Sequence, residues 1–384
     1  MISSEILGIE QYLVELRRDL HSNPETAFRE FKTADRIAAE LENAGLSVRK
    51  GIGKTGVVGV LEGAKSGPTL LIRADIDALP IAEQTALSFA STNGAMHACG
   101  HDGHIAMAVG AARVLAATRE KLNGRVVFAF QPAEEIVHGA LAMIEDGVLE
   151  TPKPDRVVGI HLWNALDLGR VGVNMGTVFA SADVIRITVN GRGGHGAAPQ
   201  DTVDPVVTSA EIVTALQTIV SREISPNDMG VLTFGQINGG SAPNVIPDSV
   251  ILEGTVRAFK PEIRSTIFKA TERVAAAVAS SMRAEAHFEH LYGSPPVINN
   301  PEVAAFVARH ATAVVGEEMV GEVTPTSMGD DMSEFLNRVP GCYFFIGAAA
   351  KGGEGHHSVR FDFDERALTI GSQIYVRAAR EYLG

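Results

Sequence analysis

Three histidines and one cysteine lie within eight residues, in the segment His97-Ala-Cys99-Gly-His101-Asp102-Gly-His104. In an extended loop, Cys99 and His101 would project to the same side because they are two positions apart. A thiolate and an imidazole on one side of the chain can bind the same metal ion. A helix that begins directly after them would favour the anionic thiolate at its N-terminus. The segment therefore indicates a metal site, although a chance grouping of histidines in a turn would give the same pattern.

A second candidate is the sequence QPAEE at 131–135, directly after the apolar run 125–130. Active sites of α/β proteins lie where buried parallel strands end. If the chain is extended here, the carboxylates of Glu134 and Glu135 point in opposite directions, so one can bind metal while the other faces a substrate. Taken alone, the pair is more typical of two solvated acids that open a helix.

Two more histidine positions complete the set. His161 lies near the end of the apolar run 157–163, where a single histidine is usually a hydrogen-bonded core residue. The sequence GHHS at 355–358 is, by itself, typical of a polar surface loop. Together with the first two clusters, these groups supply sulfur, nitrogen and oxygen ligands for two divalent ions. Two such ions would lower the pKa of a bridging water and polarise a scissile carbonyl, and a carboxylate that binds no metal must then move the proton.

Alternating helix and strand patterns in the first part of the chain indicate what positions these residues. Apolar residues at helical spacing predict helices over 5–21, 32–45 and 105–118. Apolar, β-rich runs predict strands at 57–61, 69–72, 125–130 and 157–163. This order predicts an α/β catalytic domain with a central, mostly parallel sheet flanked by helices.

The pattern changes near residue 184. Strand and helix signals then follow in the order β-α-β-β-α-β, with helices over 205–222 and 261–281, which is typical of a small α+β module of ferredoxin-like type. Signals of the first kind resume after residue 297. We therefore predict a catalytic domain of residues 1–184 and 298–384, interrupted by an inserted α+β domain of residues 185–297.

The composition argues against several classes of function. The net charge of -13 and the lack of a Lys/Arg-rich stripe argue against binding to nucleic acid or to an anionic membrane. The apolar fraction of 45% is typical of a soluble globular protein, and residues 1–20 predict an amphipathic helix rather than a signal peptide. The two cysteines do not form a disulfide framework, and Cys342 is expected in the core. We expect a cytoplasmic protein.

The order of these motifs resembles the M20 metallopeptidase family, in particular its amidohydrolase branch of hippurate hydrolases, aminoacylases and auxin-conjugate hydrolases. The segments that carry the resemblance run through nearly the whole chain and are RADIDALP (73–80), HACGHDGH (97–104), QPAEE (131–135), GIH (159–161), GGHGAAP (193–199), APNVIP (242–247), GTVR (254–257) and HSVRFD (357–362). Together they are highly specific.

The resemblance implies roles for individual residues of the first domain. The implied metal ligands are Cys99, which would bridge two ions, His101, Glu135, His161 and His357. His357 is preferred to His356 because the metal histidine of the family directly precedes a serine. Glu134 would be the general base, and Asp77 would orient a ligand histidine. The implied cofactors are two divalent metal ions, with Zn, Mn, Ni and Co as candidates.

The resemblance also implies that the inserted domain is a lid that mediates assembly into a homodimer or higher homo-oligomer. His195 of this lid would stabilise the oxyanion formed during the reaction. Asn244 and Arg257 would hold the carboxylate of the substrate, a task that suits a guanidinium. Without the family, His195 would be read as an incidental histidine in a glycine-rich turn.

We predict metal-dependent hydrolysis of the amide bond of a small N-acyl amino acid or similar amide, with a metal-activated water and Glu134 as the base. A dipeptidase or carboxypeptidase of the same family is an alternative. A cysteine hydrolase using Cys99 and His101 is another, but it leaves Glu135 and His357 without a role. A non-catalytic small-molecule-binding protein is a third, but such proteins usually lose a ligand or the base, and this sequence keeps all of them.

Overall fold

The computed structural model describes all 384 residues, which form two compact units. The first unit comprises Met1–Val178, Ile298–Thr324 and Asp331–Gly384. The second comprises Phe179–Val297 and Pro325–Asp330. The second unit therefore begins a few residues before the inserted domain predicted at 185–297, and it includes a short later segment that the sequence did not indicate.

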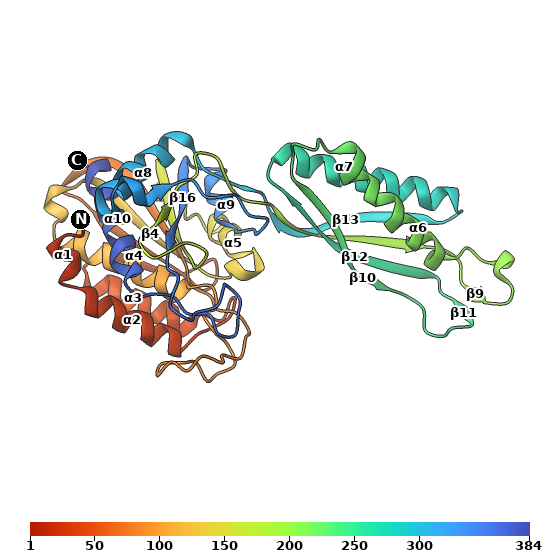
Figure 1. The fold of residues 1–384 in the computed structure, drawn as a ribbon, viewed down its shortest axis with the longest axis horizontal. Coiled ribbons are helices and arrows are strands. Elements are labelled where there is room, and N and C mark those ends of the chain that lie inside the picture. The colour runs from red at the N-terminus through yellow and green to blue at the C-terminus, as the bar shows by residue number, and fades with distance from the viewer. The chain divides into compact units, whose positions relative to one another are not determined.

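An eight-stranded sheet forms the centre of the first unit, in the order β1-β2-β4-β3-β5-β16-β6-β15 (Figure 1). Its strands are β1 (Ser47–Ile52), β2 (Gly56–Glu62), β3 (Lys65–Asp75), β4 (Asn123–Gln131), β5 (Arg156–Trp163), β6 (Val171–Gly172), β15 (Val320–Gly321) and β16 (Gly341–Gly347). The central strands β4, β3, β5 and β16 are all parallel to their neighbours within this group, and the antiparallel pairs lie toward the edges. The predicted α/β class with a mostly parallel sheet is confirmed.

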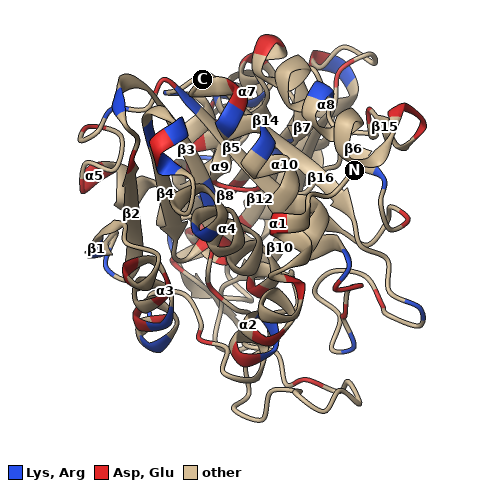
Figure 2. Ribbon diagram, turned by 90° about the vertical axis from the view of Figure 1, so that its left-hand side faces the viewer, with Lys and Arg blue, Asp and Glu red and all other residues tan.

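Helices cover both faces of this sheet. They are α1 (Ser4–Leu7), α2 (Glu10–Ser22), α3 (Phe31–Asn43), α4 (His101–Ala116), α5 (Gly139–Glu145), α8 (Pro301–Val315), α9 (Met332–Leu336) and α10 (Ala367–Tyr382). Helices α4 and α10 pack on each other and both contact β3, whereas α5 and α9 lie on the opposite side of the sheet (Figure 1). Acidic and basic residues are mixed along α2 and α3, and these helices show no basic stripe (Figure 2).

Helix α4 is the centre of this packing, and every one of its residues except Arg113 is buried. Its Ala- and Gly-rich sequence lets neighbouring helices approach closely. A Cβ atom at Gly110 would lie 2.6 Å from Leu13 of α2 and 2.9 Å from Ser372 of α10, so a larger residue there would separate the helices. The helix begins at His101 rather than at the predicted residue 105, and the histidine motif therefore forms its first turn.

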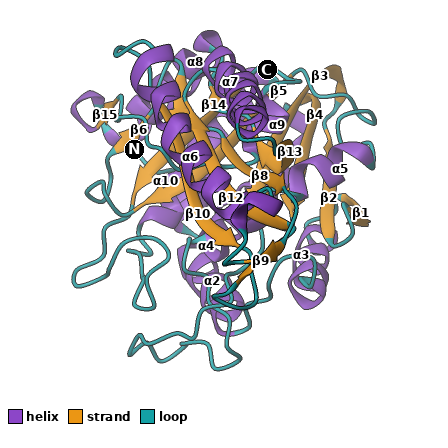
Figure 3. Ribbon diagram, turned by 90° about the vertical axis from the view of Figure 1, so that its right-hand side faces the viewer, coloured by secondary structure: helices purple, strands orange, loops and turns teal.

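The second unit contains a four-stranded antiparallel sheet in the order β10-β12-β8-β13, with two helices on one face (Figure 3). Its elements are β8 (Ala182–Asn190), α6 (Pro205–Thr218), β10 (Gly230–Asn238), β12 (Ser249–Ala258), α7 (Pro261–Ser281) and β13 (Glu285–Ser294). Buried positions alternate with partly or fully exposed ones along β8 and β12, as expected for a sheet covered on one face only. This is the predicted β-α-β-β-α-β order.

Short strands complete the structure. β9 (Gly194–His195) and β11 (Val245–Ile246) pair in a separate ribbon of the second unit. β7 (Thr177–Phe179) and β14 (Val297–Ile298) pair where the chain passes from one unit to the other. None of the helices has the length and apolar character needed to cross a bilayer.

Candidate metal centre

Three neighbouring parallel strands of the first unit end at the same edge of the sheet. β3 ends at Asp75, β4 at Gln131 and β5 at Trp163, and Asp75 is paired in register with Gln131. Carboxyl ends of parallel strands are where α/β folds place their sites. The predicted site residues of this unit that lie at or near these strand ends, or at the start of α4, are Asp77, Cys99, His101, Glu134, Glu135 and His161.

The structure brings all five predicted metal ligands together. The Sγ atom of Cys99 lies 3.6 Å from Nε2 of His161. The two carboxylate oxygens of Glu135 lie 3.9 Å from Nε2 of His101 and 3.4 Å from Nε2 of His357. Ligand atoms of Cys99, His101 and His161 lie within 4.8 Å of one another, and so do those of Cys99, Glu135 and His357. Cys99 belongs to both groups, which is the arrangement that a bridging ligand requires.

Hydrogen bonds fix which nitrogen of each ring faces the centre. Nδ1 of His101 lies 2.8 Å from the carbonyl oxygen of Asp77, and Nδ1 of His161 lies 2.6 Å from that of Leu162. A carbonyl oxygen only accepts, so Nδ1 carries a proton in both rings, and Nε2 is the nitrogen that would bind an ion when it is unprotonated. The rings are therefore held in the tautomer that a metal ligand needs.

Two of the ligand atoms are buried without a hydrogen-bond partner, namely Nε2 of His101 and Oε1 of Glu135. Buried polar atoms nearly always have a partner. These two lie 3.9 Å apart, within reach of one ion that would bind each of them at about 2.0–2.2 Å. A divalent cation between them would satisfy both atoms, and the thiol, imidazole and carboxylate groups present are suitable ligands for it.

The charges around the centre also favour a bound cation. Burial lowers the pKa of His101, but the carboxylates of Asp75, Glu135 and Asp77 outweigh this effect and raise it to about 10. Burial raises the pKa of Glu135 to about 8, against the attraction of His101. Burial also holds the pKa of His161 well below its usual range, so this ring is neutral, the form that binds metal. The acids therefore create a buried region that attracts positive charge strongly.

Asp77 holds the backbone of the two adjacent glutamates. Its carboxylate oxygens accept hydrogen bonds from the backbone N–H groups of Glu134 and Glu135, each at 3.0 Å. The predicted contact with a ligand histidine is also present, since one carboxylate oxygen of Asp77 lies 3.5 Å from Nδ1 of His101, although the shorter contact is to the carbonyl oxygen. One acidic residue thus positions groups in the turn after β4 and on α4.

The glutamate pair lies in a 3₁₀ turn, Glu134–Ile136, and the prediction of extended chain at this point is wrong. The turn lies between Ala133 and Val137, which both have a φ of 51°. Residues with a Cβ atom adopt this left-handed conformation rarely, and such strain concentrates at functional sites. The buried carboxylate of Glu30 supports the turn by accepting a hydrogen bond of 3.0 Å from the backbone N–H of Ala133. Both glutamate side chains consequently approach the same histidine, with Oε2 of Glu134 lying 4.0 Å from Nε2 of His101.

The two adjacent histidines near the C-terminus have different environments. His357 has a φ of 64°, and its backbone N–H donates to the carbonyl oxygen of Ala98, 2.8 Å away, so its loop is fixed to the Cys99 segment. Nε2 of His356 instead donates to the carbonyl oxygen of Leu162 at 2.8 Å. The geometry therefore favours His357 as the ligand.

A buried polar network that was not predicted from the sequence lies beneath the centre. The guanidinium of Arg73 donates to Asp75 at 2.6 Å, to Gln131 at 2.8 Å and to Asp331 at 3.2 Å. Asp75 also accepts a hydrogen bond of 2.6 Å from Nδ1 of His104. The signal that could have revealed this network is the alternation of Arg73 and Asp75 on a strand whose other residues nearby are apolar, because charges are rarely buried unless they are paired.

The three remaining predicted site residues belong to the second unit. His195 is exposed on β9 and is paired with Val245, the residue after Asn244. The backbone N–H of Ala197 donates to Nδ1 of His195 at 3.0 Å, so Nε2 of this ring carries the proton and can donate. Arg257 is half-buried on β12, and burial lowers its pKa.

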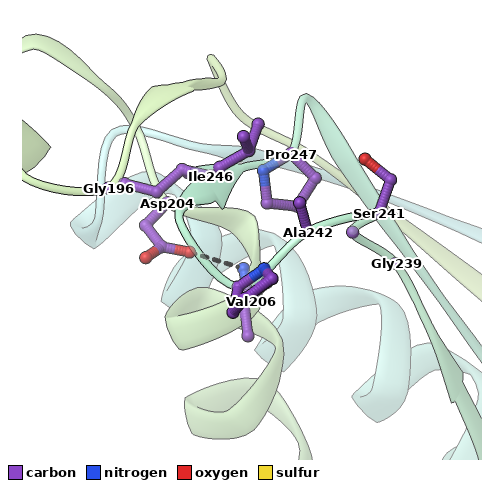
Figure 4. Close-up of a pocket in the computed structure, with 11 residues that line it drawn as sticks. Gly196, Asp204, Val206, Gly239, Ser241, Ala242, Ile246 and Pro247 are labelled. Carbon is purple, nitrogen blue, oxygen red and sulfur yellow. Dashed lines mark hydrogen bonds between the residues drawn. The ribbon is translucent and has the colours of Figure 1, made fainter.

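A pocket of about 470 Å³ lies beside the β9–β11 ribbon (Figure 4). Its walls consist of glycine backbone and of apolar side chains such as Ala242, Ile246 and Pro247. The one charged residue in the wall is Asp204, whose carboxylate accepts from the backbone N–H of Val206 at 2.8 Å and so caps α6. The carboxylate of Asp204 therefore serves as the N-cap of α6.

Comparison with known proteins agrees with this geometry. The profile of Peptidase family M20/M25/M40 matches residues 71–381. The chain is 38% identical over 382 residues to N-acetyl-L-cysteine deacetylase of Bacillus subtilis, covering 98% of this chain and 89% of the relative. It is 34% identical to thermostable carboxypeptidase 2 of Saccharolobus solfataricus, covering 99% and 98%. The crystal structure of the YXEP protein of Bacillus subtilis, a dinuclear metal binding peptidase from the M20 family, superposes with a TM-score of 0.86 at 34% identity, covering 98% and 99%.

The fold and the five converging ligands define a metal-dependent hydrolase with a site of the dinuclear kind. The chain belongs to Peptidase family M20/M25/M40. It is an enzyme that hydrolyses amide bonds, and the family and enzyme class predicted from the sequence are confirmed.

Proposed function

We propose that the protein cleaves the amide bond of N-acyl amino acids and releases a carboxylic acid and a free amino acid. The observation that carries this proposal is the convergence of five ligand side chains, two of which have a buried atom without a hydrogen-bond partner. A further carboxylate, that of Glu134, lies beside them in a turn held by Asp77. A relative that deacetylates N-acetyl-L-cysteine supports a small N-acyl amino acid as the substrate.

We infer that two divalent ions are held by Cys99, His101, Glu135, His161 and His357. Such ions, when bound, lower the pKa of a water molecule and polarise the scissile carbonyl. Thiolate and imidazole ligands suit Zn, Ni and Co, and carboxylates also tolerate Mn, so these four metals are the candidates.

Glu134 is the proposed general base. Its carboxylate takes a proton from the attacking water as the water oxygen bonds to the carbonyl carbon. It then gives this proton to the leaving nitrogen as the carbon–nitrogen bond breaks. The hydrogen bond from its backbone to Asp77 keeps the carboxylate in place while it performs both transfers.

Residues of the second unit are proposed to bind the substrate. The protonated Nε2 of His195 would donate a hydrogen bond to the oxyanion formed at the former carbonyl oxygen. The side chains of Asn244 and Arg257 would hold the carboxylate of the amino-acid part, which favours substrates with a free carboxylate.

We further propose that the second unit is a lid through which two chains form a dimer. It has several exposed large apolar side chains that suit an interface. On α6 these are Val206 and Val207, and on the edge strand β10 they are Val231 and Ile237. In such a dimer, His195 would serve the metal centre of the partner chain. Neither Cys99 nor Cys342 takes part in a disulfide, which fits the cytoplasmic location that we propose.

Mixing two inactive variants tests the dimer proposal. A chain with Glu134→Gln and a chain with His195→Ala are each expected to be nearly inactive. If His195 acts across the dimer, mixed dimers contain one complete site, so random re-association should restore about one quarter of wild-type activity. Activity would be followed by release of the free amino acid, and light scattering would report the oligomeric state. No restoration in mixed dimers would show that His195 acts within its own chain.

Removing metal tests the proposed chemistry. Dialysis against a chelator is expected to abolish hydrolysis of N-acetyl amino acids, and adding back Zn, Mn, Ni or Co should restore it, because five side chains converge on the inferred ions. Elemental analysis would give the number of ions per chain. Full activity of metal-free protein, lost on alkylation of its thiols, would instead support a mechanism with Cys99 as the nucleophile.

A carboxypeptidase activity is the second candidate, because a carboxypeptidase is 34% identical over nearly the whole chain. Both activities need a free carboxylate beside the scissile bond. A substrate panel of N-acetyl, N-benzoyl and indole-acetyl amino acids, assayed beside dipeptides and longer peptides, separates the two. Faster turnover of peptides than of all N-acyl amino acids would overturn the preferred substrate class.

A further inference from the structure

A buried arginine outside the metal centre contacts several segments that carry the ligands. Arg17, on α2, is 0% exposed. Its Nε atom donates to Asp102 at 2.8 Å, its Nη2 atom to Asp362 at 3.0 Å, and its Nη1 atom to Glu365 at 3.1 Å. One guanidinium therefore joins three carboxylates that are far apart in the sequence.

The positions of these carboxylates connect Arg17 to the centre. Asp102 directly follows His101 in the first turn of α4, the helix that packs beside α2 (Figure 2). Asp362 and Glu365 follow the loop that carries His357. The ligands at the start of α4 and the ligand on the C-terminal loop are thus linked through a single side chain that touches none of them.

Aromatic rings and a second α2 residue reinforce the contact. The guanidinium carbon of Arg17 lies 4.2 Å from the ring centroid of Phe363 and 4.9 Å from that of Phe89, which belongs to the loop before Cys99. His21, one helical turn after Arg17, lies 2.8 Å from the same oxygen of Asp102. Burying a cation this completely is costly unless it is fully paired, so the arrangement is specified by the sequence rather than incidental.

We propose that Arg17 is a positioning residue of the metal centre, fixing the start of α4 relative to the His357 loop so that the two groups of ligands keep the spacing that two ions require. This inference rests on the proposed function, because it assigns Arg17 an effect on metal binding. Partners beyond the direct ligands typically influence metal affinity by 10–100-fold when they orient the ligands.

The test compares the metal affinity of variants, not only their activity. Metal-free wild-type protein, Arg17→Met and Arg17→Lys would be titrated with Co²⁺ against a chromogenic chelator, and the thiolate-to-cobalt absorption band would report the Cys99 environment. Arg17→Met is expected to bind Co²⁺ about 10–100-fold more weakly with an altered band. Arg17→Lys should be intermediate, because an ammonium keeps the charge but cannot hold three carboxylates in a fixed geometry.

Arg18 provides the matched control. It pairs with Glu365 through two hydrogen bonds, but its side chain is 46% exposed and donates no hydrogen bond to Asp102 or Asp362. Arg18→Met is therefore expected to bind Co²⁺ as wild type does. Equal affinity and an unchanged band for a folded Arg17→Met protein would overturn the proposal.

A second variant keeps the test decisive if Arg17→Met does not fold. Asp362→Asn removes one charged contact at a side chain that is 26% exposed, so it leaves the core filled. It is expected to weaken Co²⁺ binding several-fold without loss of folding, and unchanged binding in this variant would also overturn the proposal. A wild-type protein that bound no Co²⁺ would instead refute the proposed function itself, which distinguishes the two failures.

Discussion

Replacing Glu134 by Gln is expected to lower kcat by about 10²–10⁴-fold while leaving the metal content unchanged. The amide keeps the shape of the side chain but cannot take a proton from water or return it to the leaving nitrogen. The backbone bond to Asp77 does not involve the side chain, so the turn should persist. Steady-state kinetics with an N-acetyl amino acid and elemental analysis of the same preparation would measure both quantities.

The adjacent residue gives the sharpest comparison. Glu135→Gln should lose metal as well as activity, because Oε1 and Oε2 of Glu135 face His101 and His357. Glu145→Gln, at an exposed position at the end of α5, should change neither quantity. Near-normal turnover by Glu134→Gln would remove Glu134 from the role of base, and loss of metal from it would make Glu134 a ligand.

Replacing Asp331 by Ala is expected to lower the free energy of unfolding of the first unit by about 3–5 kcal/mol. Asp331 is 0% exposed and accepts hydrogen bonds from Arg73 at 3.2 Å, from Gln131 at 2.6 Å and from the backbone N–H of Ala140 at 2.9 Å. Its removal leaves buried donors without this acceptor and reduces the negative charge around the buried guanidinium of Arg73. Urea unfolding followed by the fluorescence of the single tryptophan, Trp163 on β5, would report this unit.

An exposed ion pair serves as the control for this measurement. Asp35 pairs with Lys50 at 2.8 Å, but the two side chains are 70% and 54% exposed. Asp35→Ala should therefore leave the free energy of unfolding nearly unchanged. A similarly small change for Asp331→Ala would mean that the buried network reorganises around the missing carboxylate and does not stabilise the fold.

Local sequence patterns were sufficient to predict an element or a ligand where the residues that specify it lie within a short segment. Helix α7 was predicted at 261–281 and spans Pro261–Ser281, because a proline at its first position and apolar residues at helical spacing mark both its start and its length. The ligands were recognisable because cysteine, histidine and glutamate occurred together in short motifs near strand ends. The buried position predicted for Cys342 is confirmed, as it lies within the fully buried strand β16.

Contacts between distant segments explain what the sequence did not reveal. Asp331 is 258 residues from Arg73, and Asp362 is 345 residues from Arg17, so no local pattern pairs them. The turn at Glu134 was expected to be extended because its own residues do not require a 3₁₀ conformation. It is imposed by the carboxylates of Asp77 and Glu30, which come from other parts of the chain.

The place of β16 in the first sheet has a consequence for how the protein is made. This strand lies between β5 and β6, yet it is translated after the entire second unit. A nascent chain that has emerged only as far as residue 330 therefore carries two unpaired strand edges, at β5 and β6, which favour aggregation. Almost all of the second unit is one continuous stretch of chain. It can therefore fold on the ribosome before the last segment of the first unit has been synthesised. Truncated products of this protein should accordingly require chaperones to stay dispersed.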